Sequence, residues 1–92
     1  MKISFDPAKR AVNLVKHGLD LADAGEVLDG PCIDLLDDLR EHGEERWVST
    51  GLLRGAIVVC VWAERGEDEA RIISLRKAST NEQRDYIQEY FG

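Results

Sequence analysis

Three β-rich runs in the second half of the chain constrain the fold more than any other feature. They cover residues 46 to 53, 56 to 63 and 71 to 75, and short connections that contain glycine separate them. Connections of this kind between β-rich runs indicate an antiparallel meander. The middle run is apolar on both faces from Ile57 to Trp62. We therefore predict a sheet in which this run is a central strand, covered on both sides.

A first helix is predicted from Pro7 to Gly18, with Asp6 as its N-cap and a C-terminal glycine as its stop signal. At 100° per residue, its apolar and polar side chains separate onto two sides. We expect the polar side to form a basic outer face and the apolar side to pack inward. The apolar arc contains Ala8, Ala11, Val12, Leu14 and Val15, and the basic face contains Lys9, Arg10, Asn13, Lys16 and His17.

Two more helices and two short strands complete the predicted order. A second helix is expected to start at a cap on Asp20 and to stop at Gly30, and a third starts at Ser79, where Glu82 completes a capping box. Short strands are expected over residues 3 to 5 and 32 to 35, with an exposed charged loop over 37 to 45. The order β-α-α-β-β-β-β-α gives an α+β fold with helices packed on an antiparallel sheet. In the third helix, one apolar stripe is formed by Tyr86, Ile87, Tyr90 and Phe91.

Length and composition indicate a single globular domain over residues 1 to 92, with 43% apolar and 33% charged residues. No apolar run approaches the roughly 20 residues of a membrane helix, and the N-terminus lacks the pattern of a signal peptide, so we expect a cytoplasmic protein without membrane contacts. Cys32 and Cys60 lack CxxC spacing, and together with His17 and His42 they match no zinc pattern. Neither a metal nor another cofactor is expected.

The net charge of −6 is unevenly distributed along the chain. Residues 1 to 17 and 70 to 84 each carry a balance of +3, whereas residues 18 to 69 carry −10. This pattern argues against general nucleic-acid binding, but it allows a focused cationic site if the two basic segments meet in space. The acidic middle is compatible with a surface for a basic partner or with solubility alone.

Five blocks in fixed order span nearly the whole chain: FDPAKRAVNLVKHGLDLADAGEVL, GEERWVSTG, VVCVWAERG, RIISLRKAS and NEQRDY. In this order and at these spacings, they resemble the BrnT family of toxins from bacterial type II toxin-antitoxin pairs. The chain departs from the family pattern in its shorter first strand and in Trp62, which stands where the family usually has tyrosine. These departures concern packing more than the charged motifs.

The resemblance implies a RelE-like fold and a metal-independent endoribonuclease that cleaves RNA and inhibits translation. It also implies neutralisation by a BrnA-like ribbon-helix-helix antitoxin, in a complex with two copies of each protein, and contact with DNA only through that antitoxin. An alternative from another class is a degenerate, non-catalytic RelE-like domain that binds a protein target. The acidic middle favours this alternative, and the ordered basic motifs favour the ribonuclease.

Metal-free RNA cleavage needs a base for the 2′-hydroxyl, an acid for the 5′-oxygen, and cations for the charge on the phosphate. His17 is the candidate acid or base, although it is equally suited to cap a helix C-terminus. Arg65, Arg76 and Lys77 are the candidate catalytic cations, with surface ion pairs as the alternative for each. The substrate-binding candidates are Lys9, Asn13, Lys16, Glu45, Arg46, Trp47 and Ser74.

Several of these candidates have two readings from sequence. Glu45 and Arg46 either complete the site or brace it, and Trp47 either stacks on a base or packs on the sheet. We rank Arg76 and Lys77 above Arg65, because the helix start that follows them adds backbone donors.

Strand alternation and the hairpin make two further geometric predictions. Ser74 and Arg76 should lie on one face and Lys77 on the other. Arg65 should lie near Arg71, with Arg76 at the far end of the same strand. We therefore predict a cleft with residues 71 to 82 as one wall and the basic face of the first helix as the other.

Overall fold

The computed structural model describes residues 1–37 and 44–92. The predicted charged loop, with His42, falls largely on residues 38–43, which lie outside the described part. None of the described helices is long and apolar enough to cross a membrane. The elements are β1 (Lys2–Phe5), α1 (Pro7–His17), the 3-10 turn η1 (Leu21–Asp23), α2 (Ala24–Asp29), β2 (Ile33–Asp37), β3 (Arg46–Leu53), β4 (Ala56–Arg65), β5 (Glu69–Lys77) and α3 (Thr80–Phe91).

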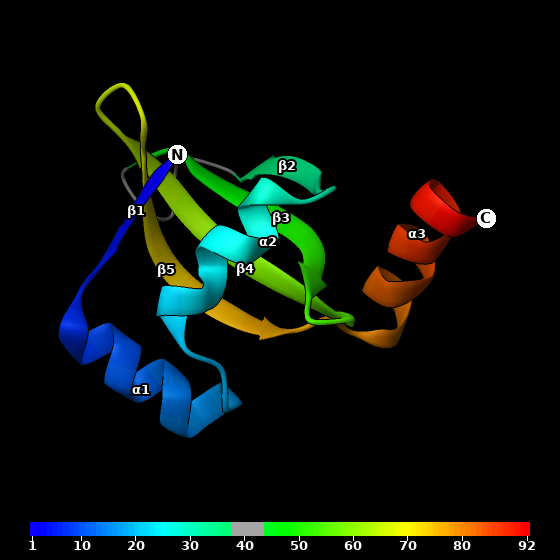
Figure 1. Cartoon of the computed structure of the whole chain (residues 1–92), viewed down its shortest axis with the longest axis horizontal. Coiled ribbons are helices and arrows are strands. Elements are labelled where there is room, and N and C mark those ends of the chain that lie inside the picture. Colours follow the sequence, from blue (N-terminus) through cyan, green and yellow to red (C-terminus); the bar gives the residue numbers. More distant parts are fainter. Residues whose placement is uncertain (38–43) are drawn as a thin grey trace.

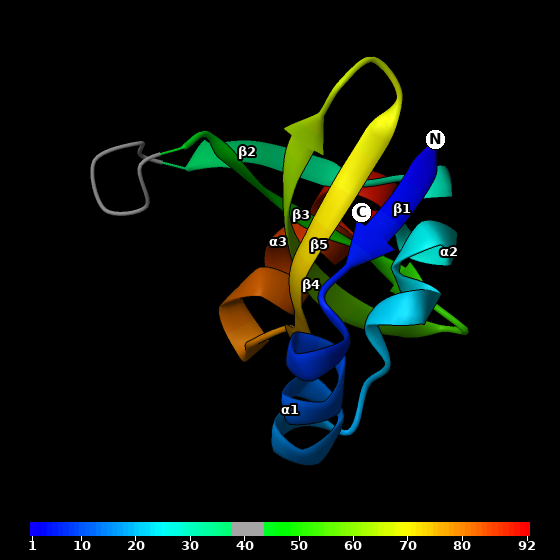
Figure 2. The same ribbon diagram turned by 90° about the vertical axis from the view of Figure 1, so that its left-hand side faces the viewer.

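The five strands form one mixed sheet in the order β1-β5-β4-β3-β2. The prediction of an antiparallel meander is confirmed for β2 to β5, but β1 runs parallel to β5, with Lys2 opposite Glu69 and Phe5 opposite Ile72. Figure 2 shows β1 beside β5, with the chain passing directly from β1 into α1. Because most of the chain separates these two strands, no hairpin turn fixes their relative direction.

The central strand and its first hairpin agree with the sequence. Arg54 and Gly55 both have positive φ, 49° and 84°, as a tight two-residue hairpin turn requires. Val58, Val59 and Cys60 of β4 are fully buried, which confirms a strand covered on both sides. A bulge at Val61 and Trp62 adds one residue to β5 and shifts its alternation there.

The main core lies between η1-α2 and one face of the sheet. Leu21 and Val27 are fully buried there against Cys60 and the other core residues of β4 and β5. Gly51 of β3 allows α2 to approach closely, since a Cβ atom at this position would lie 2.9 Å from Val27 Cγ1. The predicted cap on Asp20 is confirmed, but the first turn that follows it is a 3-10 turn.

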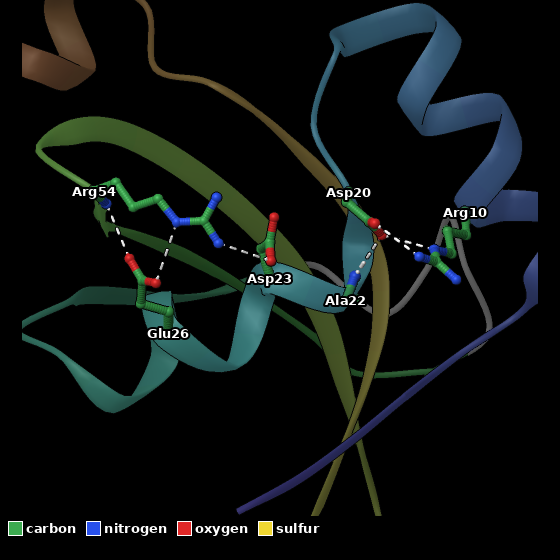
Figure 3. Close-up of polar contacts among 6 residues, drawn as sticks. All are labelled: Arg10, Asp20, Ala22, Asp23, Glu26 and Arg54. Carbon is green, nitrogen blue, oxygen red and sulfur yellow. Dashed lines mark hydrogen bonds and ion pairs between the residues drawn. The ribbon is translucent and has the colours of Figure 1, made fainter.

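Ion pairs attach η1 and α2 to their neighbours (Figure 3). Arg10 of α1 donates two hydrogen bonds of 2.8 Å to Asp20, and these bonds lower the pKa of Asp20 to about 2. Arg54, in the turn between β3 and β4, donates to Asp23 at 3.1 Å and pairs with Glu26 at 3.6 Å. Both arginines therefore have a structural role, since each joins two elements of the fold.

The predicted orientation of α1 is wrong. Val12 and Val15 are 63% and 90% exposed, whereas Asn13 is buried. The Asn13 amide donates to the backbone carbonyls of Leu75 and Leu19, both at 2.9 Å, and its oxygen accepts from the Leu75 N–H at 3.1 Å. Because β1 pairs with only the first half of β5, Asn13 replaces a strand at the remaining edge.

Helix α3 lies at the opposite end of the molecule from α1 (Figure 1). The capping box of Ser79 and Glu82 is confirmed. The Tyr86 hydroxyl donates to the carbonyl of Pro31 at 2.8 Å, and the Tyr86 side chain is fully buried. The rest of the predicted apolar stripe stays largely exposed, with Phe91 at 68%.

Candidate functional site

Two adjoining hollows run along α1 where it faces β5. The first, of about 290 Å³, brings His17, Lys16 and Lys9 of α1 opposite Ser74 of β5. The second, of about 210 Å³, continues from it, and the two share Lys9 and Ile73. We call the two together the α1 groove.

One arginine from each of three neighbouring strands enters the second hollow. Arg46 comes from β3, Arg65 from β4 and Arg71 from β5. The register places Arg71 opposite Ala63 and Arg65 opposite Glu69, which confirms that Arg65 and Arg71 lie close together. With Lys9, the hollow contains four cations and two carboxylates, Asp6 and Glu44.

Glu44 occupies the cationic end of the groove. Its carboxylate pairs with Arg65 at 2.8 Å and with Arg46 at 3.9 Å. The hydrogen bond from Arg65 lowers the pKa of Glu44, and the charges of Arg46 and Lys9 act in the same direction. Arg65 therefore forms the surface ion pair that was predicted as its alternative role.

The other cations of the groove are available to a ligand. Within the described part of the chain, Lys9, Lys16 and Arg71 form no ion pair of hydrogen-bonding length. His17, in the last turn of α1, is only partly exposed and lies in the same hollow as Lys16. The groove therefore combines a group able to transfer protons with three cations, Lys9, Lys16 and Arg71, that form no ion pair with another described residue.

Arg76 and Lys77 do not line the α1 groove, contrary to the predicted cleft. Arg76 donates two hydrogen bonds, of 2.8 and 2.9 Å, to the carboxylate of Glu82 in α3. Lys77 is exposed, and its strand position opposes Val58, whereas Arg76 opposes Val59. Their predicted divergence is confirmed, and the wall opposite α1 is formed by residues 71 to 74, which precede them in β5.

Of three further substrate-binding candidates, Asn13 lines the first hollow, whereas Trp47 and Glu45 line neither hollow. Both amide hydrogens of Asn13 are used by backbone carbonyls, so its role is structural. Trp47 lies on the core side of the sheet, where its ring stacks on Trp62 with centroids 6.2 Å apart. Glu45 is exposed, and its neighbour Glu44 enters the hollow instead.

Sequence reasoning missed Arg71 and Glu44 as members of the site. The signal for Arg71 was present, since the hairpin already placed it beside Arg65. For Glu44, the alternation of β3 gives no information, because this residue precedes the strand. Among the described residues, no three His, Cys, Asp or Glu side chains converge as metal ligands would.

Comparison with known proteins connects this groove to a family. A family model described as "Ribonuclease toxin, BrnT, of type II toxin-antitoxin system" matches residues 5–82. The chain belongs to the BrnT family. BrnT proteins are ribonuclease toxins of type II toxin-antitoxin systems, so RNA is the substrate and an antitoxin is the partner.

A solved structure supports the same assignment. The crystal structure of the Brucella abortus ribonuclease toxin BrnT is 30% identical in sequence and superposes with a TM-score of 0.65. The match covers 87% of this chain and 99% of the Brucella chain. A search of curated proteins found no significant match. The α1 groove lies inside the matched residues 5–82 and is therefore part of the BrnT domain.

Proposed function

We propose that this BrnT chain is a metal-independent endoribonuclease that cleaves RNA in the α1 groove and thereby inhibits translation. One observation carries the proposal: two adjoining hollows share Lys9 and so unite His17 with the arginines of three strands. A proton-transfer group beside clustered cations is what RNA cleavage without a metal requires.

The reaction divides between the two hollows. The 2′-oxygen of the ribose attacks the adjacent phosphorus as it loses its proton to a base, and the bond from phosphorus to the 5′-oxygen breaks as that oxygen gains a proton from an acid. His17 exchanges one of these two protons, and a water molecule exchanges the other with solvent. Lys9, Arg65 and Arg71 stabilise the charge that develops on the phosphate oxygens.

Arg46 and Glu44 set the geometry of the second hollow. Glu44 holds Arg65 in place before RNA arrives, and an RNA phosphate then competes with this carboxylate for the same cations. Arg46 lies within 3.9 Å of Glu44 and adds to the positive field around it. Lys16 and Ser74, beside His17, contact the ribose-phosphate backbone next to the scissile bond.

The proposed cellular context follows from the family. The protein acts in the cytoplasm and is neutralised by a BrnA-like ribbon-helix-helix antitoxin, in a complex with two copies of each protein. DNA is contacted only through that antitoxin. A toxin that inhibits translation by cutting RNA needs access to cytoplasmic RNA, and a type II toxin needs a protein to restrain it.

Cleavage in excess EDTA tests the chemistry. Purified protein is incubated with an RNA oligonucleotide, and the products are expected to carry a 2′,3′-cyclic phosphate and a 5′-hydroxyl. His17→Ala is expected to lower the rate by about 10²-fold to 10⁴-fold, the usual contribution of a general acid or base. Arg71→Ala should lower it strongly as well.

Arg84→Ala is the matched control, because Arg84 is an exposed arginine of α3 that lines a separate hollow. Circular dichroism and antitoxin binding establish that each variant is folded. The proposed site is wrong if His17→Ala and Arg71→Ala cut RNA as fast as Arg84→Ala. A folded wild-type protein that cuts no RNA would instead favour a non-catalytic domain that binds a protein target.

A further inference from the structure

Helix α1 presents an apolar face to solvent. Val15 is 90% exposed and Val12 63% exposed, and with Ala11 they line a shallow hollow together with Lys16. We call Ala11, Val12 and Val15 the valine face. Exposed aliphatic side chains gathered on one helix face are typical of a protein-binding surface.

The valine face adjoins the α1 groove. Val12 and Lys16 line both the hollow on the valine face and the first hollow of the groove. Lys9 then continues into the second hollow. An apolar surface therefore borders directly on Lys16 and Lys9, which form no ion pairs with other described residues.

An apolar surface beside lysines is better suited to one kind of ligand than to others. RNA is recognised through phosphate contacts and through stacking on aromatic rings or arginine, and valine offers neither. A second copy of the chain is also disfavoured, because a symmetric contact through α1 would bring Lys16 of both copies together. An amphipathic protein segment with carboxylates beside its apolar side chains complements both the valines and the lysines.

We propose that an acidic, amphipathic segment of the antitoxin docks on the valine face and extends carboxylates to Lys16 and Lys9, which blocks the α1 groove. The inference rests on the proposed function, since it concerns regulation of that same groove. RNA and antitoxin then share the cations, but only the antitoxin uses the valine face. Inhibition is competitive for this reason.

Two substitutions at one position test the surface and its charge separately. Val15→Glu and Val15→Lys both remove the apolar side chain from a site outside the groove, and both are compatible with a helix. The binding partner is the purified antitoxin encoded by the neighbouring gene. Val15→Glu is expected to weaken its binding by at least roughly tenfold, the value of one buried aliphatic side chain.

Val15→Lys should weaken antitoxin binding less than Val15→Glu, because an acidic segment attracts the added cation. Ile87→Glu, which changes an exposed β-branched residue of α3, serves as the control and should leave the dissociation constant unchanged. RNA cleavage by both Val15 variants should equal that of the wild type. Antitoxin should no longer protect RNA from Val15→Glu at a concentration that fully inhibits the wild type.

Three outcomes would overturn the inference: unchanged antitoxin binding by both Val15 variants, equal weakening by both, or self-association of the wild type that Val15→Glu abolishes while antitoxin binding persists. Light scattering on the separated protein measures self-association. The binding comparison does not require catalysis. A wild-type protein without ribonuclease activity would refute the proposed function, but the dissociation constants of the Val15 variants would still test docking on the valine face.

Discussion

Asn13 is the residue whose replacement most sharply tests how α1 is attached. Asn13→Ala removes the side-chain oxygen that accepts from the buried Leu75 N–H at 3.1 Å. It also removes the amide group that donates to the carbonyls of Leu75 and Leu19. An unsatisfied buried group costs about 1 to 3 kcal/mol, and the carbonyls lose less than the N–H because they have a second lone pair. We expect the free energy of unfolding to fall by about 3 kcal/mol.

Urea unfolding measures this loss, with the midpoint expected to fall at an unchanged slope. In a domain of this size, the melting temperature should fall by roughly 10 to 20 °C. Val15→Ala is the matched control, because it shortens a 90% exposed side chain of the same helix and should change stability by less than about 0.5 kcal/mol. The reasoning is refuted if Asn13→Ala is as stable as this control, since Asn13 would then lie on an outer face, as the sequence alone suggested.

Three further predictions concern packing, pH and the groove. Gly51→Ala should destabilise the protein by about 1 to 3 kcal/mol in thermal unfolding, because its Cβ meets α2 at 2.9 Å, whereas Gly25→Ala meets atoms only at 3.8 Å and should be neutral or stabilising. Arginine pairing lowers the pKa of Glu82 to about 2 from an ordinary 4.5, so its contribution is present above pH 4.5 and is lost as the pH falls towards 2. Glu82→Gln should therefore lower stability at pH 7 by less than about 1 kcal/mol, since the pair is partly solvated, and should flatten acid unfolding in that window. Glu44→Gln frees Arg65 for phosphate, so RNA affinity should rise severalfold and its salt dependence should steepen in a titration at several ionic strengths.

Local signals in the sequence predicted the elements well because the forces behind them are local. Asp6 and Ser79 cap the helices as expected, and the Arg54-Gly55 turn sets the register of the central hairpin. Each of these features involves residues only a few positions apart. The direction of β1 depends instead on β5, more than 60 residues away, and no turn between them carries that information.

The part of the candidate site that follows from local helix and strand patterns was predicted correctly. Lys9, Lys16, His17 and Ser74 meet in one hollow, as two walls drawn from α1 and β5 require. Arg76 was ranked too highly because the helix start beside it was considered as a phosphate site, whereas the ion pair given as its alternative role forms with Glu82. Glu82 accepts from Ser79 N–H at 2.8 Å and from Arg76. The Glu82 carboxylate therefore occupies the position at the start of α3 where a phosphate was predicted to bind.

The inverted orientation of α1 connects the fold to the proposed regulation. A helix with a clear apolar arc normally buries it, and here one buried amide attaches the helix to the β5 edge in place of that arc. This attachment leaves Val12 and Val15 in solvent at some cost in stability, while it turns Lys9, Lys16 and His17 towards β5. A rotation that buried the valines would move these three residues away from the arginines. The same orientation of α1 thus forms the groove and exposes the surface through which we propose that an antitoxin closes it.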